Sequence, residues 1–190
     1  MTLNDQFLSS VINDVDENSS YVTSVSDQVT KSYTEELDIM MQMISEDICK
    51  DEPVPINDLE RYFLNLSNLI YFVGMNLESV GIKDDVSKAM AKESYNNSYL
   101  GNQYDSTGKT KKTVSELTAL AEGDSIYQTT VNAIYSRVYK TIKFKIDAAQ
   151  TMLSTISKVI SKRMVEMQLS SSGIGMQMNG QITSDRRLME

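Results

Sequence analysis

A run of about 44 residues, Ile126 to Leu169, contains neither proline nor glycine and repeats its apolar residues at helical spacing. At about 100° per residue, steps of three and four residues place these side chains in one sector of a helix. They are Ile134, Val138, Ile142, Ile146, Ala149, Leu153, Ile156, Ile160, Met164 and Met167. The opposite sector carries Arg137, Lys140, Lys143, Lys158 and Lys162. Such a helix needs a partner for its apolar side and offers cations on the other side.

The rest of the chain is also suited to helices. With two prolines, eight glycines and no tryptophan among 190 residues, it has few turn signals, and no stretch alternates as a strand would. We therefore predict an all-α protein of few, long amphipathic helices, an elongated protomer whose core is completed by homo-oligomerisation. In that arrangement the apolar sector forms a coiled-coil-like interface between copies, through Ile134, Val138, Ile142, Ile146, Leu153, Ile156 and Ile160.

The periodic pattern divides the chain into successive helices. It predicts them over residues 3–12, 22–48, 59–81, 84–100, 114–122 and 126–169. A polar linker is expected over residues 14–20 and a loop over residues 101–110.

Particular residues mark several helix ends. Pro53 and Pro55 end one helix because proline lacks the backbone donor. Asn57 is a candidate cap for the next helix, and Thr113 with Glu116 matches a capping box. Gly123 and Asp124 would end the short helix and offer a cap for the long one.

Charge is unevenly distributed along the chain, whose formal net charge is −8. Residues 1–90 hold five Lys and Arg against seventeen Asp and Glu, whereas residues 91–190 hold thirteen against nine. We expect an acidic helical N-terminal region over residues 1–83 and a helical region with a basic C-terminal helix over residues 84–170. Residues 171–190, with Arg186 and Arg187 near the end, are expected to be a mobile tail.

The composition argues against enzymatic chemistry. The chain contains no histidine, so the commonest general base and the usual zinc ligand are absent, and we expect no cofactor and no metal. Paired carboxylates such as Glu35 and Glu36 suit polar helix faces. Cys49 is the only cysteine, and the most apolar run, residues 64–82, is interrupted by polar residues. A reducing compartment and no membrane span are therefore expected.

Two further groups of residues could contact an anionic polymer. Lys109, Lys111 and Lys112 lie in or beside the polar loop, where they could neutralise phosphates or simply be solvated. Lys88, Lys92, Tyr95 and Tyr99 share one helix face, at spacings of four, three and four. Such tyrosines could stack on unpaired bases, but buried tyrosines flanked by lysines would give the same pattern.

Several of these segments resemble the UvsY-type recombination mediator proteins of tailed phages. The resemblance lies in Ser87-Lys88-Ala89-Met90-Ala91-Lys92 leading to Tyr95, then in Lys112-Thr113-Val114-Ser115-Glu116-Leu117, and in the long helix from about Tyr135. It covers at most residues 85–170, and this chain adds a long acidic N-terminal half. The resemblance implies a helical, ring-like oligomer that binds single-stranded DNA without sequence preference.

The same resemblance implies a biological role. A mediator of this kind loads a recombinase onto DNA covered by single-strand-binding protein, in the cytoplasm of an infected bacterial cell. The family's basic segment before the loop corresponds here to Lys88 and Lys92. A competing hypothesis is a helical structural or assembly protein of a phage virion, whose charged faces contact other subunits instead of DNA. Charge alone leaves a third interpretation, in which the basic face is ordinary solvated surface.

Overall fold

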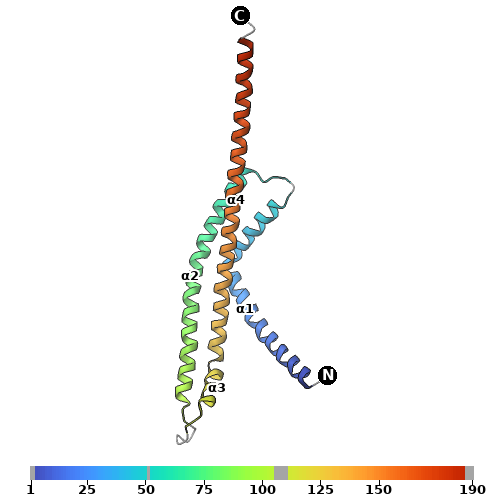
Figure 1. Cartoon of the computed structure of the whole chain (residues 1–190). Coiled ribbons are helices and arrows are strands. Elements are labelled where there is room, and N and C mark those ends of the chain that lie inside the picture. The colour runs from blue at the N-terminus through green and yellow to red at the C-terminus, as the bar shows by residue number, and fades with distance from the viewer. Residues whose placement is uncertain (1–2, 51, 105–110, 187–190) are drawn as a thin grey trace. The chain divides into compact units, whose positions relative to one another are not determined.

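The computed structural model of the chain is α-helical (Figure 1). It describes the backbone of residues 3–50, 52–104 and 111–186, and the side chains of residues 16, 19–50, 52–104 and 111–171. The helices are α1 (Leu3–Ile48), α2 (Ile56–Gly101), α3 (Val114–Asp124) and α4 (Ile126–Arg186). Over these ranges no strand forms, although one isolated antiparallel bridge joins Tyr104 to Lys111. The predicted all-α class is confirmed.

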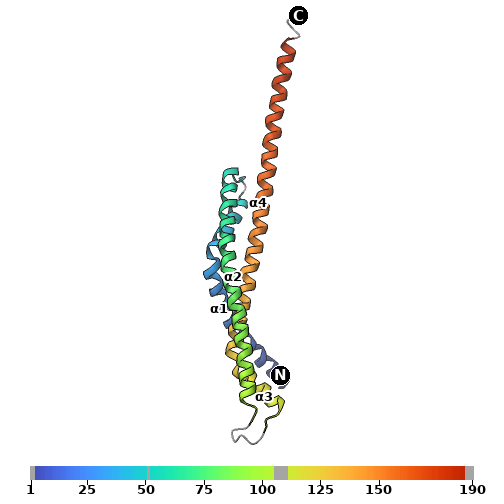
Figure 2. The same ribbon diagram turned by 90° about the vertical axis from the view of Figure 1, so that its left-hand side faces the viewer.

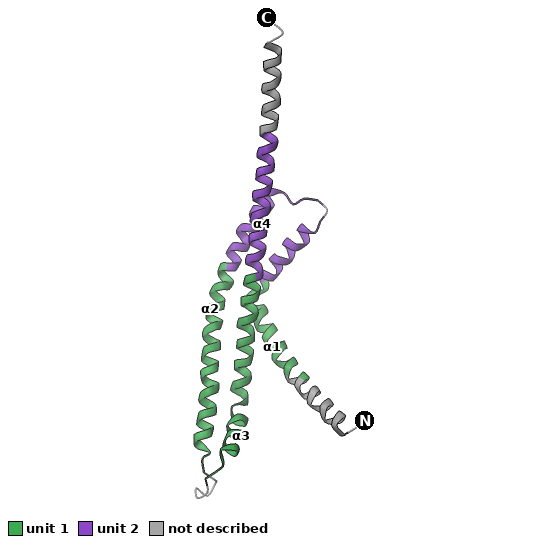
Figure 3. Ribbon diagram, in the orientation of Figure 1, with its two compact units in different colours: residues 1–35, 71–147 green, residues 36–70, 148–190 purple. Residues whose placement is uncertain are grey.

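The chain forms two compact units, which are coloured separately in Figure 3. Unit 1 contains residues 1–35 and 71–147, and unit 2 contains residues 36–70 and 148–190. Helices α1, α2 and α4 each contribute one stretch to both units, whereas α3 belongs to unit 1. The two units divide α2 between residues 70 and 71, whereas the sequence led us to expect a division between residues 83 and 84.

In unit 1, side-chain hydrogen bonds join α1, α2 and α4 pairwise. Lys145 of α4 donates from Nζ to Thr34 Oγ1 of α1 at 3.0 Å, and Lys83 of α2 donates to Tyr33 Oη of α1 at 2.9 Å. Asn132 of α4 donates from Nδ2 to Ser87 Oγ of α2 at 3.1 Å. Figures 1 and 2 both show α3 beside the C-terminal end of α2, where Ser98 Oγ donates to Asp124 Oδ2. These bonds fix the three long stretches as a bundle.

The interior of unit 1 combines apolar and small polar side chains. Its buried residues are Ser26, Thr30, Thr34, Val73, Val80, Ser87, Leu117, Ala121, Ser125, Val138, Ile142 and Ile146. The hydroxyls of Ser26 and Thr34 donate to carbonyls one turn earlier in α1, at 2.6 and 3.2 Å, which satisfies them inside the helix.

Unit 2 has a smaller interior built from the same three helices. Leu37, Ile44, Leu59, Leu66, Ala149 and Ile156 are buried there. Tyr62 of α2 donates to Asp47 of α1, and Arg163 of α4 donates to the carbonyl of Val54 in the connection between α1 and α2. Lys50 and then Tyr62, by hydrogen bonding to the carboxylate, lower the pKa of Asp47.

Two expected interruptions are absent. The linker predicted over residues 14–20 lies within the continuous helix α1, because residues 1–50 contain no proline or glycine and local polarity alone does not end a helix. The break predicted between Gly81 and Asp84 is also wrong. A Cβ at Gly81 would lie 3.2 Å from the Tyr139 ring, so this glycine permits close packing of α4 on α2 instead of ending a helix.

The remaining helix ends are largely as predicted. The break between α1 and α2 contains Pro53 and Pro55. Helix α2 begins at Ile56, before the predicted cap Asn57, and the Pro55 carbonyl accepts its first backbone bonds, from the amides of Asp58 and Leu59, both at 3.1 Å. Thr113 and Glu116 form the predicted capping box of α3. The carbonyl of Ser125, not that of Asp124, accepts the first backbone bond of α4, at 2.9 Å from the amide of Thr129.

The apolar sector of α4 is largely buried within the chain. Val138, Ile142, Ile146, Ala149 and Ile156 are at most 8% exposed, and Ile134, Leu153 and Ile160 are half-buried. The prediction that this sector forms an interface between copies is therefore wrong for its buried residues. Periodicity shows that a face needs cover but not which chain supplies it. Met164 and Met167, near the end of the sector, are exposed.

Helix α4 also continues beyond the expected end of the basic helix. Its backbone is helical as far as Arg186, so residues 171–186 are helical where a tail was expected. No proline interrupts this segment, and isolated glycines weaken a helix without necessarily ending it. Arg187 lies outside the described residues.

Candidate nucleic-acid interface

The outward face of α4 in unit 1 carries three cations. Arg137, Lys140 and Lys143 are exposed, on the opposite side of the helix from Val138, Ile142 and Ile146. Because apolar residues recur every three or four positions, burying them turns the intervening basic residues outward. The exposure predicted for these three cations from the sequence is confirmed.

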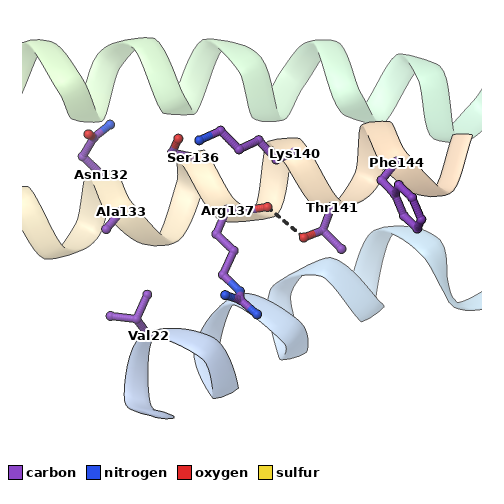
Figure 4. A pocket seen from close by; sticks show the side chains of 8 residues that line it. All are labelled: Val22, Asn132, Ala133, Ser136, Arg137, Lys140, Thr141 and Phe144. Carbon is purple, nitrogen blue, oxygen red and sulfur yellow. Dashed lines mark hydrogen bonds between the residues drawn. The ribbon is translucent and has the colours of Figure 1, made fainter. Parts of the chain in front are cut away.

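Part of this face forms one side of a groove of about 670 Å³ (Figure 4). Seven of its lining residues come from α4 and one from α1: Val22, Asn132, Ala133, Ser136, Arg137, Lys140, Thr141 and Phe144. In Figure 4 the side chain of Arg137 extends toward α1, and that of Lys140 extends from the other side of α4. Both cations line the groove within one turn of helix, and their side chains diverge from each other.

Phe144 adds an aromatic surface to the same groove. Its side chain is 72% exposed and lies seven residues after Arg137, so both residues are on one face of α4. Non-sequence-specific binding of single strands combines cations that follow the backbone with aromatic rings on which bases stack. Arg137, Lys140 and Phe144 supply both components.

The groove cations are electrostatically available. Among the described residues, no ion pair within 4.0 Å involves Arg137, Lys140 or Lys143. A phosphate arriving there would not have to displace a carboxylate, so binding would release counterions without the loss of an internal salt bridge.

Asn132 fixes the end of the groove nearest α3. Its Nδ2 donates to the carbonyl and Oδ1 of Asp84, both at 3.3 Å, and to the buried Ser87 hydroxyl. This half-buried amide, with its partners on α2, holds the register of α4 against α2. Arg137 and Lys140 lie five and eight residues further along the same helix, so their positions are set on a fixed element.

Two further basic residues of α4, Lys145 and Arg163, do not belong to the exposed face. Lys145 is half-buried and bonded to Thr34 in unit 1, and Arg163 is half-buried and bonded to the Val54 carbonyl in unit 2. Their position at the edge of the apolar sector explains this, since long basic side chains extend from such edges toward polar partners.

Lys158 and Lys162 are also exposed, but they belong to unit 2. Lys162 Nζ lies 3.8 Å from Glu166 Oε1, one turn later on the same helix. Such an exposed pair contributes little and does not prevent contact with another anion. Neither lysine lines the groove.

The predicted residues of α2 and the following connection lie away from the groove lining. Lys88 and Lys92 are exposed on α2, while Tyr95 and Tyr99 are half-buried and stack on each other, with ring centroids 6.3 Å apart.

The lysines around the loop are only partly described. Lys111 is exposed and Lys112 is half-buried, with its backbone amide donating to the Gln103 carbonyl at 3.0 Å. Lys109 lies outside the described residues.

Sequence reasoning missed several groove residues, chiefly Phe144 and Val22. Phe144 could have been found, because Ala133, Arg137, Lys140 and Phe144 follow one another at steps of four, three and four. Val22 belongs to a distant segment, and its place in the lining depends on how α1 packs on α4.

Over the described side chains, no cluster of three or more Cys, Asp or Glu residues has metal-binding geometry. Over the residues that the structure describes, none of the helices is long and apolar enough to cross a membrane. Comparison with protein-family models, curated proteins and solved structures found no match to this chain.

Proposed function

We propose that the protein is a nonenzymatic accessory protein that binds single-stranded DNA without sequence preference. The observation that carries this proposal is the groove on α4, which is lined by exposed Arg137, Lys140 and Phe144. Cations without carboxylate partners suit a phosphodiester backbone, and an exposed ring suits an unpaired base. Neither contact depends on base identity.

The biological role that we propose is recombination mediation in a phage. This part of the proposal rests on the resemblance of residues 85–170 to UvsY-type mediators, and it includes a recombinase and a single-strand-binding protein as partners. It also includes a homo-oligomer acting in the cytoplasm of an infected bacterium. In this role the protein performs no catalysis, and the groove holds the strand while the recombinase is loaded.

A matched pair of double variants tests the strand-binding proposal. Arg137→Gln with Lys140→Gln removes two groove cations, whereas Lys31→Gln with Arg61→Gln removes two exposed cations elsewhere. Both variants change the net charge equally, so long-range electrostatics are matched. Fluorescence anisotropy with a labelled oligonucleotide at about 50 mM salt, where phosphate contacts are strong, should show weaker binding only for the groove variant.

Two results would overturn this proposal. One is no binding of the oligonucleotide by the unmodified protein under these conditions. The other is equal loss of affinity in the two double variants, which would mean that net charge and not the groove governs binding.

A second candidate function is supported by the exposed apolar residues of α2, which include Phe72, Met75 and Ile82. Exposed apolar side chains gathered on one helix are typical of protein-contact faces. It favours the structural or assembly protein considered above. Charge reversal at Lys140 and Lys143 separates the two functions: a strand-binding protein loses DNA affinity and still assembles, whereas an assembly protein that uses its charged faces loses assembly.

A further inference from the structure

In unit 1, helix α2 has apolar residues on two opposite faces. Val73 and Val80 are buried on its inner face, together with Ser87. The outer face carries Phe72, Met75, Ile82 and Val86, which are between 52% and 62% exposed. A helix that is apolar on both sides needs cover on both sides. The fold of the described chain supplies only the inner cover.

The outer face follows a heptad repeat. Phe72, Ser79 and Val86 are spaced by seven residues, and Met75, Ile82 and Ala89 follow each of them by three. All six side chains are exposed. This is the a and d pattern by which two helices pack knobs into holes. We call these six residues the α2 seam.

We propose that a second copy of this chain packs along the α2 seam, with the two α2 helices parallel in a two-stranded coiled coil. A heptad seam is self-complementary in this arrangement, because each a or d residue meets the same residue of the other copy. The seam shares no residue with the α4 groove, so this inference is independent of strand binding.

The charges that flank the seam select both the partner and its direction. Glu78 and Asp85 occupy the g positions, and Lys83 occupies an e position. In a parallel pair, each g residue faces the e residue five positions later in the other copy, so Glu78 faces Lys83. Because the arrangement is two-fold, this pairing occurs twice.

An antiparallel pair would place like charges together. There the g positions face one another, so Glu78 of one copy would approach Asp85 of the other. Like charges across an interface are unfavourable, and two such contacts would arise by symmetry. The parallel arrangement avoids both contacts.

Lys83 can contact Glu78 of the other copy and keep its hydrogen bond to Tyr33. Its Nζ donates to Tyr33 Oη at 2.9 Å and lies 5.6 Å from the centre of the same ring. An ammonium group carries three donors, so others are free to reach a carboxylate. The contact with Tyr33 holds the lysine at the edge of the seam.

Sedimentation velocity of the full chain, without nucleic acid, tests whether a second copy of the chain covers the α2 seam. The unmodified protein should show a concentration-dependent species of twice 21.4 kDa, and Ile82→Glu should remain at 21.4 kDa. Ile126→Glu is the matched control, because Ile126 is 67% exposed on a different helix, and it should dimerise like the unmodified protein. Circular dichroism checks that all three proteins are equally helical.

Either of two results would overturn the proposal. A monomeric unmodified protein would mean that another molecule covers the seam, and a dimeric Ile82→Glu would place the contact elsewhere. Failure of strand binding would leave both readouts unchanged, because neither measurement involves DNA.

A cysteine cross-link tests the direction of the two helices. In a Cys49→Ser background, Ala89→Cys places one thiol at a d position near the end of the seam. In a parallel pair the two thiols are adjacent and should oxidise to a covalent dimer. In an antiparallel pair Ala89 would lie opposite Phe72, and 17 residues at 1.5 Å each separate the thiols by about 25 Å. A non-covalent dimer without this cross-link would overturn the parallel arrangement.

Discussion

Phe144 is the residue on which the nature of the proposed ligand depends most directly. Its ring is 72% exposed beside two cations, which suits stacking on an unpaired base but contributes nothing to a duplex backbone. We expect Phe144→Ala to weaken single-strand binding by about 1–3 kcal/mol, the usual contribution of one stacked base. Phe144→Tyr, which keeps the ring, should retain most of the affinity in the same anisotropy titration.

Tyr127 provides the control for this prediction. It is equally exposed, at 72%, and belongs to the same helix but does not line the groove. Tyr127→Ala should therefore bind as the unmodified protein does. Unchanged affinity in Phe144→Ala would show that the ring takes no part and that the groove offers charge alone.

At the scale of single helices, two glycines of α2 should respond differently to the same substitution. A helical glycine replaced by alanine usually stabilises a protein by about 0.5–1 kcal/mol, because it restricts the unfolded chain. A Cβ at Gly74 would meet no atom within 4 Å, so Gly74→Ala should give this full gain.

Gly81→Ala should give a smaller gain or none. Its Cβ would lie 3.2 Å from Cε2 of Tyr139, so the ring and α4 would have to move by a few tenths of an ångström. Urea unfolding followed by circular dichroism measures both changes. A gain at Gly81 equal to that at Gly74 would mean that the Tyr139 ring shifts without cost.

The capping box of α3 makes the stability of that helix depend on pH. The Thr113 amide donates to Glu116 Oε2 at 2.8 Å, and this bond, followed by that from the Thr113 hydroxyl, lowers the pKa of Glu116. A carboxyl whose pKa is lower in the folded state stabilises it above the unfolded pKa, and this contribution is lost as the pH falls through the folded pKa.

We therefore expect the helical Cα chemical shifts of α3 to decrease toward coil values below about pH 4.3, the ordinary glutamate pKa. Glu116→Gln should remove this dependence, because the amide does not titrate in that range. The same loss of helical shifts on acidification in Glu116→Gln would exclude the carboxylate as its cause.

The helices also show how far local sequence signals reach. Three features could be predicted because each depends on neighbouring residues in the chain. They are the all-α class, the break at Pro53 and Pro55, and the cap at Thr113. The continuity of α1 through residues 14–20 was missed because local polarity was given more weight than the absence of proline and glycine. The continuity of α2 through Gly81 could not be predicted, because there tertiary packing decides, as the closeness of Tyr139 to Gly81 illustrates.

At the scale of the whole molecule, sequence patterns identified faces better than their partners. The sequence correctly placed the apolar and basic residues of α4 on opposite sides of the helix. It did not show that α1 and α2 of the same chain cover much of the apolar sector. The outer face of α2 went unrecognised because its inner face, with Val73 and Val80, produced the stronger apparent pattern. Which of two apolar faces lies inside depends on contacts between segments far apart in the sequence.

The distribution of charge over the protein predicts how DNA binding depends on salt concentration. The protein carries a net charge of −8, so its average field repels DNA, and binding depends on the few cations gathered on α4. If Arg137, Lys140 and Lys143 each neutralise one phosphate, the logarithm of the binding constant should fall with the logarithm of salt concentration at a slope of about −2.

Removing Arg137 and Lys140 together should reduce the magnitude of this slope by more than half, since it counts the phosphates neutralised and not the total charge. Removing Lys31 and Arg61 changes the net charge equally and should leave the slope unchanged. Anisotropy titrations from about 50 to 200 mM salt cover the range in which such slopes are resolved. A slope near zero would mean that the strand is not held through its phosphates, whereas equal slopes in the two double variants would place the contact elsewhere on the chain.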